Sequence, residues 1–286
     1  ARTGLRVLVL EANPARKHER PIALSRDNGP NWRTPDPEAQ AEEAVLRIHA
    51  GAAALCSTQE RSESRRRPRA VDLMTLDMPG NPQHPAAEED ISMAGCMAHI
   101  AAACAEIEGP LLLVGHSGGG VIVTQAAEML AERVVGVAYL AGMMLPSGLG
   151  FAELSNSLLA TNPEAAGIWP HLVWAEDRQS SSVPPEAVCE VFLQDLPREP
   201  AMAAAQRFCS QPEGTRALVA NWTAERFGRL PRLYVEATED RSVVLAAQRK
   251  MQALVPGAQV VSLPCGHVPQ VVQTAAVAEA LLAFAS

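Results

Sequence analysis

Short runs of consecutive hydrophobic residues recur along the chain, and longer amphipathic stretches separate them. Continuous apolar runs of this kind, rich in Val and Leu, are typical of strands buried on both faces of a parallel sheet. The pattern predicts such strands at residues 5–10, 111–114, 134–140, 232–237 and 259–263, and a further strand near Val71.

Between the predicted strands, apolar residues recur at the spacing of one face of an α-helix. The predicted helices cover residues 91–107, 121–133, 244–254 and 274–285. Because strand and helix alternate, the sequence predicts an α/β fold with a mostly parallel central sheet flanked by helices.

Two regions interrupt this alternation. Residues 11–69 are rich in Pro, Arg, Glu and Ala, and we expect an atypical, loop-rich segment that includes a helix at 37–54. Residues 146–229 hold short helical stretches, several prolines and three tryptophans, which favours an inserted, mainly helical cap. The predicted organisation is a core domain in two parts, residues 1–145 and 230–286, with the cap between them.

The composition limits the partners. The chain has 286 residues, of which 48% are hydrophobic and 20% are charged, and its formal net charge is −8. This charge argues against nucleic acid or an anionic membrane as the main partner, so the basic run at residues 61–69 is expected to be a solvated loop.

No apolar run is long enough to cross a membrane, and the first apolar run, at residues 5–10, is too short for a signal peptide. We expect a cytoplasmic protein, and a secreted form whose signal has been removed stays open.

The six cysteines form no CxxC pair and lack the spacing of metal ligands. A domain of this size does not need disulfides for stability, so we expect reduced, mostly buried thiols, with disulfides open only for a secreted form. The sequence predicts no metal and no cofactor.

The stretch Gly115-His116-Ser117-Gly118-Gly119 fits G-x-S-x-G between a predicted strand and a predicted helix. This is the context of a nucleophile elbow, where a strained turn exposes a serine and glycines permit close packing. The following helix N-terminus directs amide groups at the reacting oxygen, so the Gly118 N–H is a predicted oxyanion donor. The alternative is a glycine-rich turn that binds phosphate or only packs.

A serine nucleophile needs a base and an acid that orients the base, in the chain order Ser, acid, His. His267 follows the last predicted strand, where the base belongs, whereas His171 lies in the cap. The acid follows the strand at 232–237, where Glu239 and Asp240 compete and we favour Asp240. We expect His116 to pack near the elbow rather than to act in catalysis.

The motifs VGHSGGG, ERFGRLPRLYVEATEDRSV, AQRKM and LPCGHVPQ resemble the α/β-hydrolase superfamily. Within it, residues 70–286 resemble the plant methylesterase and hydroxynitrile lyase group and its bacterial esterase relatives. The resemblance implies the α/β-hydrolase fold, with Ser117 as nucleophile, Asp240 as acid and His267 as base. It also implies that the cap shapes the acyl or alcohol pocket.

The chain departs from the pattern of this group at two places. Members show His-Gly-x after the first strand, where the third residue supplies the second oxyanion amide; here Leu10 and Glu11 precede Ala12, which matches that donor. A carboxylate at Glu11 would oppose catalysis if it pointed inward.

Hydroxynitrile lyases of the group carry a lysine directly after the catalytic histidine, where this chain has Val268, and this difference favours ester hydrolysis.

The sequence therefore predicts a serine hydrolase that cleaves a neutral, fairly hydrophobic carboxylic ester through an acyl-enzyme. The apolar cap supplies the expected substrate-binding residues, Trp169, Leu172 and Trp222. The expected partner is a small-molecule ester, without nucleic acid or membrane, and a homodimer is open. The alternatives are a hydroxynitrile lyase, a lactonase or an acyltransferase on the same triad, or a non-enzymatic ligand-binding receptor.

Overall fold

The computed structural model describes residues 6–11, 72–80 and 84–285. The predicted helix at 37–54 and the basic run at 61–69 lie outside these residues. In the described part of the chain, six strands form one sheet in the order β2-β1-β3-β4-β8-β9, and every neighbouring pair is parallel. These strands are Arg6–Glu11 (β1), Asp72–Leu76 (β2), Leu111–His116 (β3), Val134–Leu140 (β4), Arg232–Ala237 (β8) and Ala258–Leu263 (β9). The prediction of an α/β fold with a parallel sheet is confirmed.

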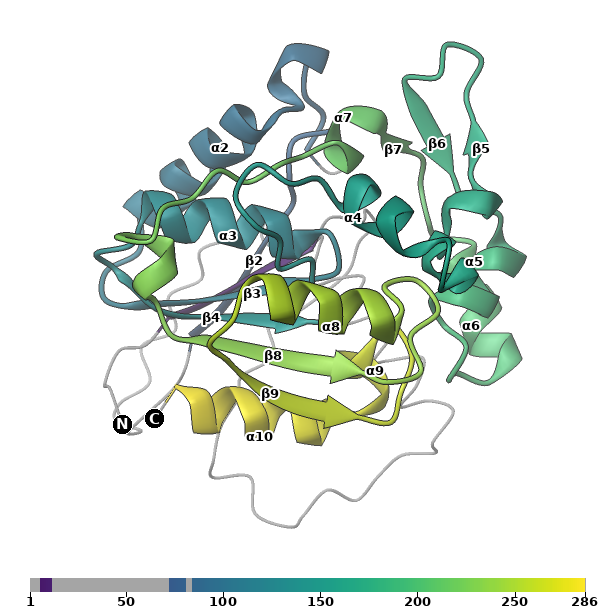
Figure 1. Ribbon diagram of the computed structural model, residues 1–286. Helices are drawn as coiled ribbons and strands as arrows, with labels where there is room; N and C mark the ends of the chain where they lie inside the picture. Colours follow the sequence, from purple (N-terminus) through teal and green to yellow (C-terminus); the bar gives the residue numbers. More distant parts are fainter. Residues whose placement is uncertain (1–5, 12–71, 81–83, 286) are drawn as a thin grey trace, which may run out of the picture.

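Helices cover both faces of this sheet (Figure 1). They are α2 (Met93–Ala105), α3 (Gly119–Met129), α8 (Leu245–Leu254), α9 (Pro269–Val272) and α10 (Thr274–Phe284), with a 3-10 helix, η1, at Glu88–Asp90. Helix α2 begins later than predicted because the Ser92 hydroxyl accepts a hydrogen bond from the Gly95 N–H, which caps the helix. Helix α3 begins earlier than predicted, because the helix continues directly from the glycine-rich turn.

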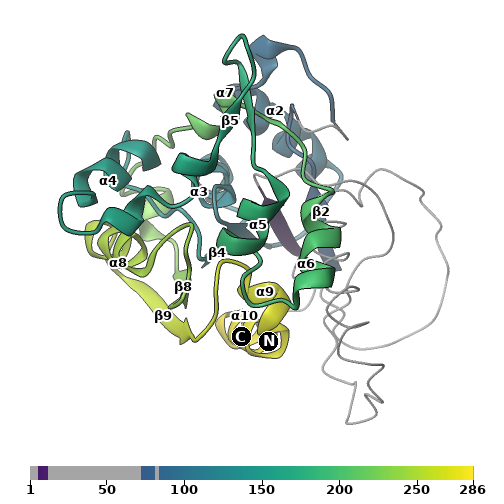
Figure 2. The same cartoon turned by 90° about the vertical axis from the view of Figure 1, so that its right-hand side faces the viewer.

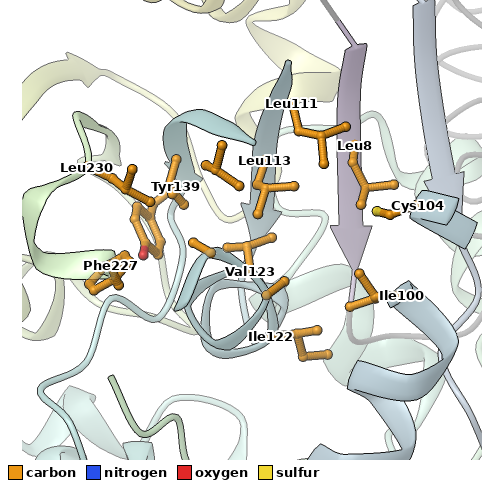
Figure 3. Packing of buried hydrophobic residues seen from close by; sticks show 14 of the residues in the cluster. Leu8, Ile100, Cys104, Leu111, Leu113, Ile122, Val123, Tyr139, Phe227 and Leu230 are labelled. Atoms are coloured by element: carbon orange, nitrogen blue, oxygen red, sulfur yellow. The ribbon is translucent and has the colours of Figure 1, made fainter. Parts of the chain in front are cut away.

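Alternate residues of each strand face opposite layers of helices. Leu111 and Leu113 of β3 belong to a cluster that includes residues of α2 and α3, whereas Leu112 and Val114 pack with residues of α10. Figure 3 shows the first cluster, with Leu8, Leu111 and Leu113 between the strands and these helices. Burial on both faces explains why these strands read as unbroken apolar runs.

Strand β9 differs from this expectation. It forms one edge of the sheet and pairs only with β8 among the described strands. Its residue Val260 is 48% exposed. The apolar run at 259–263 was predicted to be buried on both faces, and this is wrong for β9 because an edge strand is only partly covered.

The segment 146–229 contains most of the short elements of the described chain. Its helices are α4 (Phe151–Leu158), α5 (Pro185–Val191), α6 (Arg198–Ala205), α7 (Glu213–Arg216) and the 3-10 helices η2 (Pro163–Ala166), η3 (Trp169–His171) and η4 (Phe227–Arg229). A small antiparallel sheet of β5 (Val173–Trp174), β6 (Ser180–Ser182) and β7 (Gln211–Pro212) was not predicted. We call this segment the cap.

The cap packs on the core at two places. Residues of α5 and α6 form one cluster with Val268 and with Val271 of α9, and Figure 2 shows these helices close together. Leu154 of α4 packs with Ala247 and Met251 of α8 in another cluster. The cap therefore rests directly on the loops that follow β8 and β9.

The five cysteines in the described ranges are free thiols, of which Cys209 is half-buried and the others are buried, and Cys56 lies outside these ranges. None of the described helices combines the length and the apolarity needed to span a membrane.

Glu128, at the end of α3, joins this helix to the last residues of the cap. Its carboxylate accepts hydrogen bonds from the N–H groups of Thr223 and Phe227 and from the Thr223 hydroxyl, at 3.1, 3.0 and 2.8 Å. Burial alone would raise the pKa of Glu128, but these hydrogen bonds and the charge of Arg226 outweigh it and hold the pKa below its usual value.

We expect Glu128→Ala to lower the free energy of unfolding by about 1–2 kcal/mol near neutral pH, because it leaves the part-buried Phe227 N–H without an acceptor, whereas the exposed Thr223 donors can turn to water. Since the folded pKa is depressed, this stabilisation is complete above the usual pKa and is lost as the pH falls through the folded value. Urea unfolding at neutral and acidic pH measures both effects.

The matched control for this prediction is Glu132→Ala. Glu132 follows the same helix and contacts Arg229, but its side chain is 75% exposed, so its loss hardly changes stability. Equal losses in the two variants, or a Glu128→Ala effect that does not shrink in acid, would contradict this account.

Candidate active site

Ser117 lies in the turn between β3 and α3, with an unusual backbone conformation. Its φ is 51°, in the left-handed region that residues with a side chain rarely adopt. Main-chain hydrogen bonds hold the turn. The Ser117 carbonyl accepts from the Gly120 N–H (3.0 Å) in α3 and from the Met143 N–H (2.9 Å) in the segment after β4. This is the local geometry that the G-x-S-x-G motif predicts.

The glycines around Ser117 are required by close approach. A Cβ on Gly115 would lie 2.6 Å from a methyl group of Val123, and one on Gly120 would lie 2.5 Å from the Met143 nitrogen. Larger residues would push α3 away from the end of β3. The glycines therefore let the strand, the turn and the helix pack together beneath the serine.

The Gly118 N–H stands at the start of α3. Gly118 precedes the first residue of the helix, and its N–H donates to no other group of the described chain. A free amide at a helix N-terminus is a good donor to a negatively charged oxygen. The other predicted oxyanion donor, Ala12, lies outside the described residues.

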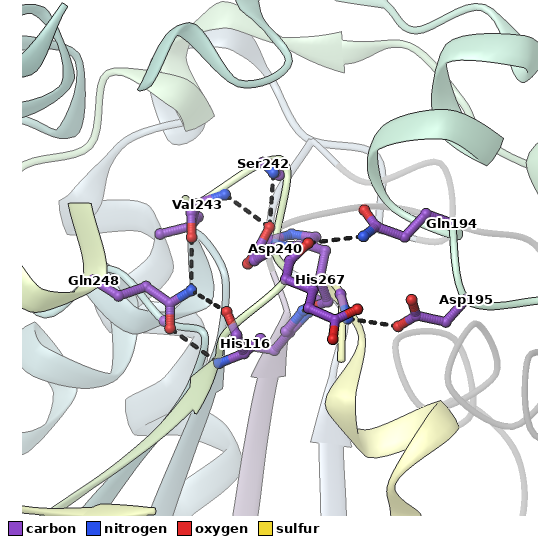
Figure 4. Close-up of polar contacts among 12 residues, drawn as sticks. His116, Gln194, Asp195, Asp240, Ser242, Val243, Gln248 and His267 are labelled. Carbon is purple, nitrogen blue, oxygen red and sulfur yellow. Dashed lines mark hydrogen bonds and ion pairs between the residues drawn. The ribbon is translucent and has the colours of Figure 1, made fainter. Parts of the chain in front are cut away.

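Asp240 and His267 are hydrogen-bonded to each other in the loops that follow β8 and β9 (Figure 4). The distance from His267 Nδ1 to Asp240 Oδ2 is 2.8 Å, and the side chains are 4% and 0% exposed. The other carboxylate oxygen of Asp240 accepts hydrogen bonds from the N–H groups of Ser242 (2.7 Å) and Val243 (3.0 Å). These contacts fix the carboxylate, and a proton on Nδ1 leaves Nε2 as the basic nitrogen of a neutral imidazole.

The structure distinguishes the two acids that competed in the sequence. Asp240 is buried and reaches His267, whereas the Glu239 side chain is exposed. The Glu239 N–H donates to the Cys265 carbonyl at 3.0 Å, so the main chain of Glu239 ties the two loops together. The other candidate base, His171, lies in η3 of the cap.

His116 links the serine turn to His267. Its Nε2 donates to the His267 carbonyl at 2.7 Å, and the centroids of the two imidazole rings are 4.8 Å apart. His116 is 8% exposed, in agreement with the expected packing role. No hydrogen bond joins Ser117 Oγ to His267 Nε2 in this structure, and in hydrolases this bond is often long until substrate binds.

The three predicted substrate-binding residues occupy different places. Trp169 is in η3 and Leu172 follows it, and both are half-buried. The Trp222 indole donates to the Leu145 carbonyl at 3.0 Å and its ring meets Phe227 edge-on at 5.0 Å. Within the described residues, no hydrogen bond or ring contact joins these three to the serine turn or to the acid–base pair.

One aromatic residue that the sequence did not single out contacts the base. The Phe192 ring, at the end of α5, lies 5.1 Å from the His267 ring between centroids. A cap residue thus packs against the imidazole.

Comparisons with known proteins give consistent matches. The model of the alpha/beta hydrolase family matches residues 15–280. A pyrethroid hydrolase of Sphingobium wenxiniae is 31% identical over 189 residues, which is 65% of this chain and 67% of that protein. The esterase PIR7B of Oryza sativa subsp. japonica is 27% identical over 202 residues, covering 65% and 74%. A crystal structure of the pyrethroid hydrolase PytH superimposes with a TM-score of 0.68 at 22% identity, covering 99% and 98%. The resemblance predicted from the motifs is confirmed.

The glycine packing around Ser117 gives a testable prediction. Gly120→Ala places a methyl group against the Met143 backbone, and such overpacking lowers the free energy of unfolding by about 1–3 kcal/mol. Gly150→Ala is the matched control, because a Cβ there meets only Val219 at 3.7 Å. Thermal unfolding of both variants measures the difference, and equal midpoints would show that close approach does not select Gly120.

Proposed function

Because the chain belongs to the alpha/beta hydrolase family, we propose that it is a carboxylic ester hydrolase with Ser117 as nucleophile, His267 as base and Asp240 as acid. The buried hydrogen bond between Asp240 and His267, next to the strained serine turn, is the observation that carries this proposal. A buried carboxylate that accepts a hydrogen bond from imidazole Nδ1 holds the imidazole in one tautomer and orientation.

The reaction consists of two acyl transfers. Ser117 Oγ attacks the ester carbonyl carbon while His267 Nε2 takes the hydroxyl proton, and Asp240 stabilises the imidazolium that forms. The Gly118 and Ala12 amides bind the negatively charged oxygen of the tetrahedral intermediate. The imidazolium then gives its proton to the leaving alcohol as the carbon–oxygen bond breaks. Water, deprotonated by His267, attacks the acyl-enzyme and releases the acid and free Ser117.

The proposed substrate is a neutral, fairly hydrophobic ester. The cap contributes an apolar cluster that includes Val268, directly after His267, and one relative is named a pyrethroid hydrolase. Val268, directly after the base, is 6% exposed and carries no charge. Without a cation there, the site favours ester hydrolysis over the release of cyanide.

The test is the hydrolysis of a short-chain nitrophenyl ester by the wild type and three variants. Ser117→Ala is expected to lower kcat at least about 10³-fold. Asp240→Asn lowers it about 10⁴-fold, because the imidazole loses its tautomer, and Glu239→Gln lowers it by less than about 2-fold. The Asp240 and Glu239 variants change neighbouring acids in the same way and differ only in contact with His267.

Two results would contradict the proposed assignment. Equal turnover by the wild type and Ser117→Ala would remove Ser117 as the nucleophile. A large loss in Glu239→Gln with normal turnover in Asp240→Asn would show that the acid had been assigned to the wrong residue.

A further inference from the structure

We infer that Gln194 and Asp195 of the cap are positioning residues that hold the loops carrying the acid and the base in their reactive arrangement. These adjacent residues lie in the turn between α5 and α6. The inference rests on the proposed function of Asp240 and His267, and it assigns the cap a part in the chemistry beyond shaping a pocket.

Gln194 holds the acid loop. Its side-chain Nε2 donates to the Glu239 carbonyl at 2.7 Å, and Glu239 directly precedes Asp240. Because consecutive residues share a peptide plane, fixing this carbonyl fixes the Asp240 backbone nitrogen. The Gln194 amide therefore restrains the backbone of the acid from a segment outside its own loop.

Asp195 holds the base loop. Its Oδ2 accepts a hydrogen bond from the Gly266 N–H at 2.5 Å, and Gly266 directly precedes His267. Such a bond from an amide to a carboxylate is charge-assisted and stronger than one between neutral groups. Figure 4 shows Gln194 and Asp195 reaching these two loops from the same side.

Gly266 permits this close contact. A Cβ at this position would lie 2.9 Å from Gln194 Cδ and 3.0 Å from Asp195 Oδ2. The glycine before the base thus leaves room for the side chains of Gln194 and Asp195, which a Cβ at this position would displace from their contacts.

Neighbouring contacts attach the same turn to the core. The Arg241 guanidinium, one residue after the acid, donates to the Glu190 carbonyl at 3.1 Å, and Phe192 packs on the His267 ring. Residues 190–195 therefore contact the chain on both sides of Asp240 and directly before His267. We call this segment the clamp.

The clamp has a chemical consequence because the triad works only in a narrow geometry. A misplacement of about 1 Å in a catalytic group can cost about 10²-fold in rate. The two loops are joined directly by the hydrogen bond from the Glu239 N–H to the Cys265 carbonyl. The clamp adds a bond to each loop from a third segment, so that neither can shift independently.

The experiment measures kcat and KM with a nitrophenyl ester, and the thermal midpoint, for the 286-residue chain. Asp195→Ala and Gln194→Ala are each expected to lower kcat roughly 10-fold while KM changes less than about 2-fold, since the lost restraint acts on the triad rather than on substrate binding. Asp195→Asn restores most of the rate, because its amide oxygen still accepts from Gly266. Glu176→Ala and Gln206→Ala are matched controls, exposed cap residues of similar chemistry, and both retain the wild-type kcat.

Different outcomes separate the two proposals. If the wild type is active and Ser117→Ala is inactive, unchanged kcat in Asp195→Ala and Gln194→Ala overturns the clamp and leaves the esterase intact. A kcat loss in Asp195→Asn as large as in Asp195→Ala, or losses accompanied by equal losses in the two controls, also overturns it. Hydrolysis that survives Ser117→Ala instead overturns the proposed function, and the clamp with it.

Discussion

The strained backbone of Ser117 is the constraint on which the rest of this structure depends. A φ of 51° at a residue with a side chain is costly, so the surrounding main chain must hold it. Hydrogen bonds from Gly120 and Met143 do so, and they require glycines where β3, α3 and the segment after β4 meet. The unbroken apolar strands of the parallel sheet supply the rigid support, because burial on both faces leaves the end of β3 little freedom to relax.

The parallel sheet also explains why the acid and the base meet. Strands β8 and β9 are neighbours with the same direction, so the loops that follow them leave the sheet at one edge. Asp240 and His267 stand in these loops, and the buried bond between them excludes water from the imidazole nitrogen that must keep its proton. The cap contacts both loops through Phe192, Gln194 and Asp195, so under the proposed function it helps to hold His267 in place.

Much of this arrangement follows from local sequence patterns, and the remainder depends on contacts between distant segments. The apolar runs predicted β4 and β8 at their observed bounds, because burial on both faces leaves a plain signal in the sequence. Glu239 and Asp240 both follow β8, and the sequence favoured Asp240 because Asp-x-x-Val leads from it into the next predicted helix. The exposure of β9 was missed although Gln259 and Ser262 interrupt its apolar run, because two polar residues in so short a strand are a weak signal of an edge. Gln194 and Asp195 were missed for a related reason: their partners are 45 and 71 residues away, and neither residue belongs to a motif.

The central claim is that Ser117 carries the acyl group during turnover, and mass spectrometry of the trapped intermediate tests it most directly. The wild type and His267→Ala are mixed briefly with an activated ester, quenched in acid and digested. In the wild type, the peptide containing Ser117 is expected to gain the mass of the acyl group, whereas His267→Ala gives little or no adduct on brief mixing because the serine hydroxyl has lost its base. Turnover with the acyl group on a different residue, or an adduct on Ser117 that forms equally fast in His267→Ala, would contradict this assignment.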